Sequence, residues 1–292
     1  MSLAGDFNNK GRGQSMNDKT NRFVAVFFIF LAVFFSDARL SHCQTLNISG
    51  CSISYIGYLS DISMAFEKQT GIKVFVRGGG SIVGLDDLYR GRVDIAASCK
   101  GRVENDPDNM EFVPVAWDAL VFIVHKTNPV EHISTGEIKE IVTGKIRTWS
   151  RLRGKSEPIK TFIVRPTVSM SGLDKSLRDL LIGDAQVVET PDIKLLPTAG
   201  MVEQIVEVTP NSFGITGYSS AKKRDVRLLK VDGIMPTKET IASKAYKLKR
   251  PLFLVAQKKP KPDVEKFIKF VLSKKGQALI SSYGVVPLRA LK

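Results

Sequence analysis

Alternating apolar and polar runs predict short buried strands separated by amphipathic helices. Val74–Val76 is β-branched and aromatic, which is typical of a buried strand. Gly78–Gly80 follow and permit a sharp turn, and Ser81 stands where a helix N-cap stands. A helix over Gly84–Tyr89 and a short buried strand over Val93–Ala97 complete this unit.

The same alternation continues through the chain and predicts an α/β fold. Further strands are predicted at Leu46–Ile48, Phe112–Val115, Ala119–Val124, Ile159–Val164, Phe213–Tyr218, Val226–Val231 and within Tyr246–Ala256. Helices are predicted at Tyr58–Lys68, Ser134–Val142, Leu173–Ile182, Met201–Val208, Val264–Leu272 and Lys274–Tyr283.

Four of these strands end in small polar residues just where a loop begins. The loops contain Ser52, Ser81, Ser98–Cys99 and the segment Arg165–Gly172. In an open α/β sheet ligands bind beyond the carboxyl ends of strands, and helix N-termini attract anions. Arg165 adds a planar guanidinium fork that suits an oxyanion. Each serine alone is equally explained as a cap or turn residue, and Arg165 alone as a salt bridge, but together they predict an anion site.

Composition narrows the kinds of partner. The chain has 292 residues, of which 43% are hydrophobic, and this is enough for one large or two medium domains. Its formal net charge is +14, but Lys and Arg are spread along the chain and no nucleic-acid motif accompanies them. The charge therefore favours anionic ligands, and we expect no nucleic-acid partner.

The N-terminus carries a predicted targeting segment. Lys19 and Arg22 precede the apolar run Phe23–Phe35, which is shorter than a membrane-spanning helix and suits a secretory signal. Met16 is an alternative start, and Cys43 lies in a sequence close to a lipoprotein signal. The alternative is an uncleaved membrane anchor. In both cases we expect a periplasmic or extracellular globular part, with residues 1–44 forming the N-terminal extension and signal peptide.

Catalytic motifs do not emerge from the sequence. The three histidines, His42, His125 and His132, have no metal-binding spacing. No nucleophile elbow or phosphate-binding Walker loop is present in the sequence. We therefore expect a binding protein rather than an enzyme, with no catalytic residues, no cofactor and no metal.

In the order of its motifs, the chain resembles the substrate-binding proteins of bacterial phosphate ABC transporters, which have the type II periplasmic-binding-protein fold. The resemblance covers nearly all of Leu46 to Pro287. Its matching stretches are ISGCSIS, VRGGGSIVGLDDLYRGRVDIAAS, WDALVFIVHKTNPV, ISTGEIKEIVTGKIRTW, the Arg165–Gly172 segment, SFGITGYSS and YKLKRPLFLV.

The resemblance implies an α/β fold of two lobes, each a mixed sheet flanked by helices, with a ligand cleft between them that closes by a hinge motion. Residues 46–124 and 246–292 would form the first lobe and residues 125–245 the second. The protein would be a monomer that captures inorganic phosphate or a similar oxyanion and delivers it to the permease subunits of an ABC transporter. The alternatives are an anion-sensing or adhesive module with the same fold, and a phosphate-ester hydrolase.

Individual site residues are also carried over by the resemblance. Ser52 and Ile53 match the first anion-binding loop, Ser81 matches the serine of the second, and Arg165 matches the arginine that pairs with the anion. The next element of the family is Ser-Gly-Thr at a helix start. Counting from Arg165 puts Ser169 there, whereas aligning the following helix puts Ser171 and Gly172 there, and we favour the second alignment.

Cys99 departs from the family pattern. Some members have an Asp at this position and others a Ser, and an ionised Asp accepts the proton of hydrogen phosphate while repelling sulfate. A neutral thiol is a weak hydrogen-bonding group, so Cys99 leaves the selectivity open, and phosphate is preferred because of the family. Cys51 and Cys99 both follow predicted strands on the binding side. They are either neighbours, as a disulfide or as two thiols near the cleft, or unrelated buried thiols.

Overall fold

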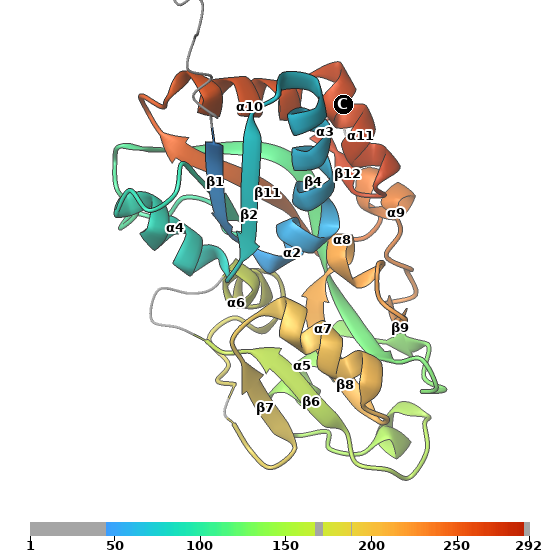
Figure 1. The fold of residues 1–292 in the computed structure, drawn as a ribbon. Coiled ribbons are helices and arrows are strands. Elements are labelled where there is room, and N and C mark those ends of the chain that lie inside the picture. The colour runs from blue at the N-terminus through green and yellow to red at the C-terminus, as the bar shows by residue number, and fades with distance from the viewer. Residues whose placement is uncertain (1–44, 167–171, 188, 289–292) are drawn as a thin grey trace, which may run out of the picture. The chain divides into compact units, whose positions relative to one another are not determined.

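The computed structural model describes residues 45–166, 172–187 and 189–288 (Figure 1). The predicted signal segment, Cys43, Ser169 and Ser171 lie outside the described residues. Within the described ranges, no helix is both long enough and apolar enough to cross a membrane.

A ten-stranded mixed sheet runs through the described part of the chain, with the strand order β2-β1-β3-β11-β4-β8-β6-β7. β12 and β9 also pair with β4. The strands are β1 (Thr45–Gly50), β2 (Lys73–Gly78), β3 (Ile95–Ser98), β4 (Met110–His125), β6 (Lys160–Val164), β7 (Ile193–Leu196), β8 (Ser212–Gly217), β9 (Val226–Leu228), β11 (Lys249–Gln257) and β12 (Val286–Pro287). β5 (His132–Ile133) and β10 (Lys230–Val231) form a separate parallel pair.

Helices connect these strands. They are α2 (Ser52–Ser54), α3 (Ser60–Thr70), α4 (Ser81–Tyr89), α5 (Thr135–Val142), α6 (Gly172–Leu177), α7 (Ala199–Val208), α8 (Tyr218–Ala221), α9 (Lys238–Ala242), α10 (Pro262–Leu272) and α11 (Lys274–Ser282). Wider π-helical turns at Tyr55–Leu59 and Arg178–Ile182 extend α2 into α3 and lengthen α6, and a 3-10 turn covers Trp149–Leu152.

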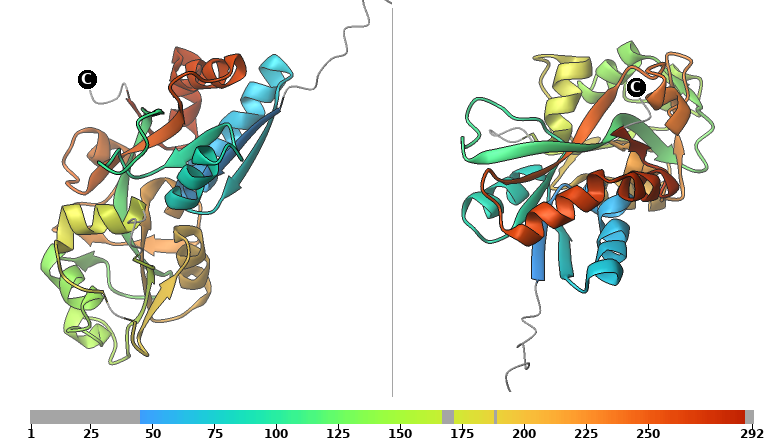
Figure 2. Two further views of the ribbon diagram at one scale, coloured as in Figure 1. Left: turned by 90° about the vertical axis from the view of Figure 1, so that its left-hand side faces the viewer. Right: turned by 90° about the horizontal axis from the view of Figure 1, so that it is seen from above.

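The part of the sheet formed by β3 and β11 is covered on both faces. Along β3, Ile95 and Ala97 belong to the large hydrophobic core, whereas Ala96 belongs to a smaller cluster that includes Leu85 and Leu88 of α4. Helix α3 packs against α10 and α11 in the large core, where the rings of Phe66 and Phe267 are 5.1 Å apart. Figure 2 shows these helices beside the strands. This two-sided burial explains why β3 is apolar from Ile95 to Ala97, whereas β1 and β2 alternate between buried and exposed positions along their first residues.

Local sequence signals explain several boundaries. Ser134 and Glu137 form the capping box that opens α5, as predicted. Gly80 has φ of 96° and is itself the N-cap of α4, so the predicted glycine turn does require a glycine. Ser81, predicted as the N-cap, is instead the first residue of the helix. Gly84 lets α4 approach β1 closely, because a Cβ at this position would lie 2.5 Å from the carbonyl oxygen of Ser49.

β4 is longer than predicted. The sequence predicts two strands, Phe112–Val115 and Ala119–Val124, but one 16-residue strand spans both. Residues Met110–Ala119 pair with β11, with a register shift at Val115, and residues Leu120–Val124 pair with β8. The polar step at Trp117–Asp118 looks like a break in the sequence, yet Asp118 is fully buried and has partners there.

Candidate functional site

A small cavity of about 30 Å³ lies where the ends of several strands and the starts of several helices meet. Its lining residues are Cys51, Ser52, Ile53, Gly80, Ser81, Cys99, Val164, Gly172, Leu173, Pro197, Thr198 and Ala199. Five predicted site residues are therefore brought together, although they are separated by up to 120 positions in sequence: Ser52, Ile53, Ser81, Cys99 and Gly172. The small volume suits a ligand of a few atoms.

Four helical segments begin at this cavity: α2, α4, α6 and α7. The first turn of a helix has backbone N–H groups without helical partners, and its dipole favours negative charge. The short helices α2 and α6 continue directly through their π-helical turns, so each is the start of a longer helical run. Four such starts around one small cavity create an environment that favours an anion.

Two serines at helix starts are fixed by hydrogen bonds. The Ser81 hydroxyl oxygen accepts the backbone N–H of Cys99 at 3.1 Å and lies 3.5 Å from the Cys99 sulfur. The Ser52 hydroxyl oxygen accepts the N–H of Gly200 in α7 at 3.3 Å. Ser52 therefore joins the first helix start to the last, and both hydroxyls are held at the cavity.

A buried ion pair supports the cavity. The Arg250 side chain donates to Asp118 Oδ2 from Nε at 3.3 Å and from Nη2 at 3.1 Å. Its Nη1 donates to the Gly172 carbonyl at 3.2 Å and to the Ser176 hydroxyl at 3.1 Å. The other Asp118 oxygen accepts from the N–H and hydroxyl of Ser219. Arg250 thus ties β4 and β11 to the start of α6.

Sequence reasoning did not identify Arg250 and Asp118 as site residues. Asp118 lies in the apolar run WDALVFIV, and Arg250 lies beside Lys249 at the start of the apolar run KRPLFLV. A charge in such a place requires a buried partner, and this signal could have paired them.

The pKa values of the two cysteines at the cavity are shifted in opposite directions. The Cys51 thiol lowers the pKa of Cys99, and the Arg250 guanidinium and the Ser81 hydroxyl lower it further, against the effect of burial. Burial raises the pKa of Cys51, and the neighbouring Cys99 raises it further. Both cysteines are free and buried. Cys99 therefore favours the thiolate, a stronger acceptor than the neutral thiol assumed in the sequence analysis.

Arg165 lies apart from this cluster. It directly follows β6, and its backbone N–H donates to the Leu196 carbonyl at 2.8 Å. Its side chain is exposed, and Arg165 is not one of the cavity-lining residues. The role of Arg165 stays a prediction, and the following segment with Ser169 and Ser171 lies outside the described residues.

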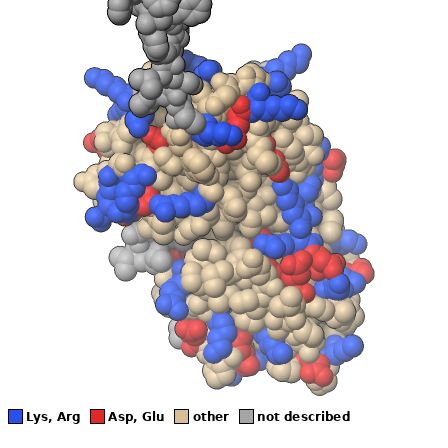
Figure 3. Space-filling view, viewed as in Figure 1, with Lys and Arg blue, Asp and Glu red and all other residues tan. Residues whose placement is uncertain are grey.

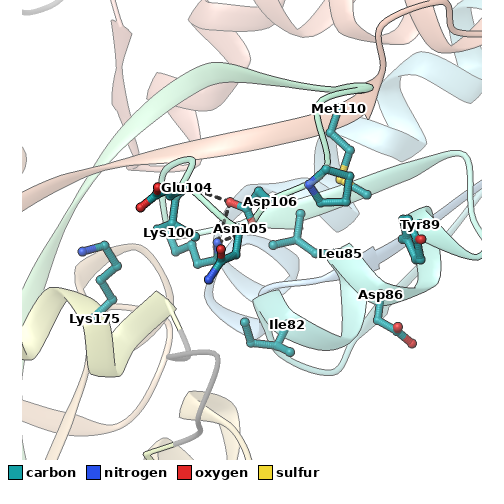
Figure 4. Close-up of a pocket in the computed structure, with 12 residues that line it drawn as sticks. Ile82, Leu85, Asp86, Tyr89, Lys100, Glu104, Asn105, Asp106, Met110 and Lys175 are labelled. Atoms are coloured by element: carbon teal, nitrogen blue, oxygen red, sulfur yellow. Dashed lines mark hydrogen bonds and ion pairs between the residues drawn. The ribbon is translucent and has the colours of Figure 1, made fainter.

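A larger cavity of about 630 Å³ lies between α4, the loop from Lys100 to Met110, and Lys175 of α6 (Figure 4). The Lys100 ammonium group is buried there, and it is paired with both carboxylate oxygens of Asp106 at 2.8 and 2.7 Å. Asp86 and Glu104 add negative charge to the lining. This cavity is therefore less suited to an anion than the small one. In the residues that the structure describes, no group of three or more His, Cys, Asp or Glu could hold a metal ion.

Comparison with known proteins identifies the family. The profile of the PBP superfamily domain matches residues 40–275. The chain belongs to the PBP superfamily.

Named relatives agree with the resemblance found in the sequence. The Phosphate-binding protein PstS of Borreliella burgdorferi is 27% identical over 279 residues, which are 91% of this chain and 98% of that protein. The protein of the same name from Bacillus subtilis is 26% identical over 258 residues, with 85% of this chain and 82% of that protein covered. The similarity to phosphate-binding proteins predicted from the sequence is thus confirmed.

Solved structures confirm the fold class. A Clostridium perfringens protein solved with bound phosphate has a TM-score of 0.76 and 24% identity, and the match covers 84% of this chain and 100% of that chain. An ABC-type phosphate transport receptor from Vibrio cholerae has a TM-score of 0.63 and 24% identity, with 84% and 100% covered. The predicted periplasmic-binding-protein-like α/β fold is therefore correct.

Proposed function

We propose that this chain is an extracytoplasmic solute-binding protein that captures inorganic phosphate and delivers it to the permease of an ABC transporter. The observation that carries the proposal is the meeting of four helix starts, with the Ser52 and Ser81 hydroxyls, around one small cavity. The relatives named as phosphate-binding proteins support phosphate as the anion.

Binding without chemistry fits the residues at the cavity. Hydroxyl groups and the backbone N–H groups of helix starts can hold an anion by hydrogen bonds, and the helix dipoles favour its charge. We propose that Ser52, Ile53, Ser81 and Gly172 contact the anion directly, as predicted from the sequence. Cys99 would accept a hydrogen bond from a protonated phosphate oxygen, and Arg165 would pair with the anion, as the resemblance implies.

We propose that the chain works as two lobes, residues 46–124 with 246–292 and residues 125–245, which close over the anion. The contacts that would form on closure include the hydrogen bond from Gly200 to Ser52 and the bond from Arg250 to the Gly172 carbonyl. A monomer would then dock on the permease with the rims of both lobes.

The face of the molecule in Figure 3 has Lys and Arg side chains spread around it rather than gathered in one patch. This distribution supports a general attraction for anions rather than a dedicated nucleic-acid surface. The extracytoplasmic location rests on the predicted signal segment and on the named relatives.

Titration calorimetry on the purified protein tests the proposal. Phosphate should bind with a one-to-one stoichiometry, arsenate should compete because it has the same shape and protonation, and sulfate should bind more weakly. Bound phosphate should also raise the melting temperature as its concentration exceeds the dissociation constant. The absence of binding heat and of a thermal shift with all three anions would contradict the proposal.

A further inference from the structure

The ends of β1 and β3 bring two cysteines together at the wall of the small cavity. β1 and β3 are parallel neighbours in which Gly50 pairs with Ala97, and the N–H of Cys51 donates to the Ala97 carbonyl at 2.8 Å. Extension of this register places Cys51 opposite Ser98, so Cys51 and Cys99 each follow directly on one of two neighbouring strands. Both cysteines line the same cavity of about 30 Å³, and each thiol affects the pKa of the other.

The two thiols have different surroundings. The Cys99 sulfur lies 3.5 Å from the Ser81 hydroxyl. The Cys51 thiol, the positive charge of the buried Arg250 and this hydroxyl all lower the pKa of Cys99. Asp118 acts in the opposite sense but is paired with Arg250. Cys51 is enclosed by apolar residues and keeps its proton. Cys99 therefore has the character of an attacking thiolate and Cys51 that of a resolving thiol.

Access to these sulfurs is limited to the cavity. Cys51 is 2% exposed and Cys99 is 5% exposed, yet both line the cavity wall. The start of α6 presses on Cys99, because a Cβ on Gly172 would lie 2.5 Å from its sulfur. A reagent larger than a few atoms can therefore reach Cys99 only when α6 moves away from β3.

We propose that Cys51 and Cys99 form a dithiol modification site that reacts with low-molecular-weight disulfides, with Cys99 as the attacking residue, and that closure of the cavity shields it. The Cys99 thiolate attacks one sulfur of the disulfide, its S–S bond breaks, and one thiolate leaves and takes up a proton. Cys51 then gives up its proton and attacks the Cys99 sulfur, which expels the second thiol. Two protein thiols are oxidised to one disulfide, and the reagent is reduced to two thiols.

The test uses glutathione disulfide, with Cys43→Ser as the background so that only two thiols remain. After incubation, exchange is stopped with acid, free thiols are blocked with excess N-ethylmaleimide in denaturant near neutral pH, and the products are located by peptide mass. The parent protein should lose both free thiols and form the Cys51–Cys99 disulfide. Cys51→Ser should accumulate glutathione on Cys99, and Cys99→Ser should remain largely unmodified. Glutathione on Cys51 in Cys99→Ser at a similar rate would overturn the assignment of roles, and two alkylatable cysteines in the oxidised parent would overturn the site.

A second measurement needs no variant at the site and covers the case in which a variant does not fold. With a trace of iodoacetamide at neutral pH, Cys99 should be labelled at least about tenfold faster than Cys51, because the thiolate is the reactive form. Equal rates, or faster labelling of Cys51, would contradict the proposal.

The shielding of Cys99 by closure rests on the proposed function, and one experiment tests the shielding separately from phosphate binding. If calorimetry shows phosphate binding, saturating phosphate should slow Cys99 labelling by at least about tenfold, since the bound form keeps α6 against β3. Phosphate that binds without slowing the labelling would refute shielding alone. A failure of phosphate to bind would refute the proposed function, and the disulfide assay would still decide the dithiol site.

Discussion

Gly172 offers a direct test of whether closure of the cavity and anion binding are one process. It stands at the start of α6, where a Cβ would lie 2.5 Å from the Cys99 sulfur and 2.8 Å from the backbone nitrogen of Lys100. Carbon atoms pack comfortably at roughly 3.5–4.0 Å, so Gly172→Ala requires α6 to withdraw by about 0.7–1 Å. The bond from Arg250 to the Gly172 carbonyl, now 3.2 Å, would stretch to about 4 Å and be lost.

The size of the effect follows from these changes. A hydrogen bond from a charged donor is worth about 1.5–3 kcal/mol, and overpacking costs a similar amount. We expect a loss of about 1.5–3 kcal/mol in the closed form, and therefore phosphate binding weakened about 10- to 100-fold. The ligand-free protein can relieve the clash by opening, so its free energy of unfolding should fall by less than this.

Calorimetry with phosphate and urea unfolding without phosphate measure the two quantities. Gly136→Ala is the matched control, because a Cβ there meets only the Ser134 hydroxyl at 3.9 Å. A dissociation constant for Gly172→Ala within twofold of the parent value would refute the reasoning. The reasoning would also be refuted if the ligand-free protein lost the whole of this free energy of unfolding while its phosphate affinity stayed unchanged. The contact between Gly172 and Cys99 would then be present with and without the ligand.

Three further substitutions probe the buried polar groups. Arg250→Met should lower the free energy of unfolding by about 3–5 kcal/mol in urea titrations, because the Asp118 carboxylate remains buried without its cation. Ser81→Ala should weaken phosphate binding about tenfold by calorimetry, because it removes a cavity hydroxyl and leaves the Cys99 N–H without its acceptor. Burial raises the pKa of Glu203 in the folded protein. The free energy of unfolding should therefore fall as the pH rises from the ordinary pKa of a glutamate to the raised pKa of Glu203. Glu203→Gln should flatten this fall in urea titrations over a pH series.

Exposed positions provide the controls. Arg90 pairs with Asp86 on the surface, so Arg90→Met should leave the free energy of unfolding nearly unchanged. Ser150→Ala changes an exposed hydroxyl outside the cavity and should leave phosphate affinity unchanged. An Arg250→Met protein as stable as Arg90→Met would contradict the importance of the buried pair. A Ser81→Ala protein with parent affinity would remove Ser81 from the site, and a Glu203→Gln protein with the parent pH profile would exclude Glu203 as its cause.

The elements that the sequence predicts well carry strong local signals. The Ser134–Glu137 capping box, the glycine turn before Ser81 and the apolar strand ending at Val164 all appear as predicted. Such signals depend on neighbouring residues alone, so tertiary packing does not override them.

Elements that depend on distant partners were missed. β7 (Ile193–Leu196) is a four-residue edge strand that exists because β6 lies beside it, and its half-buried pattern has no clear period. The sequence predicts a helix that begins at Tyr58, but the continuous helical run begins at Ser52. The early start is hard to predict because Ser52 and Ser54 are small and polar. The predicted strand Val226–Val231 is divided, with β9 paired to β4 and β10 paired to β5.

The same distinction applies to the site. Ser52, Ser81 and Gly172 could be found because each follows a strand and opens a helix. The pairing of Asp118 with Arg250 joins residues 132 positions apart, and their proximity to Cys99 depends on sheet order. Sheet order is set by tertiary packing, which one sequence does not reveal.

The sixteen-residue strand β4 has a consequence for how the molecule unfolds. Residues Met110–Ala119 hold β11, whereas Leu120–Val124 hold β8, so one uninterrupted strand is a structural member of both parts of the sheet. If either part melted, β4 would lose half of its hydrogen-bonded neighbours and the other part would lose its central strand. We therefore expect a single cooperative denaturation transition, in which an anion that stabilises the cavity protects backbone amides far from it against hydrogen exchange.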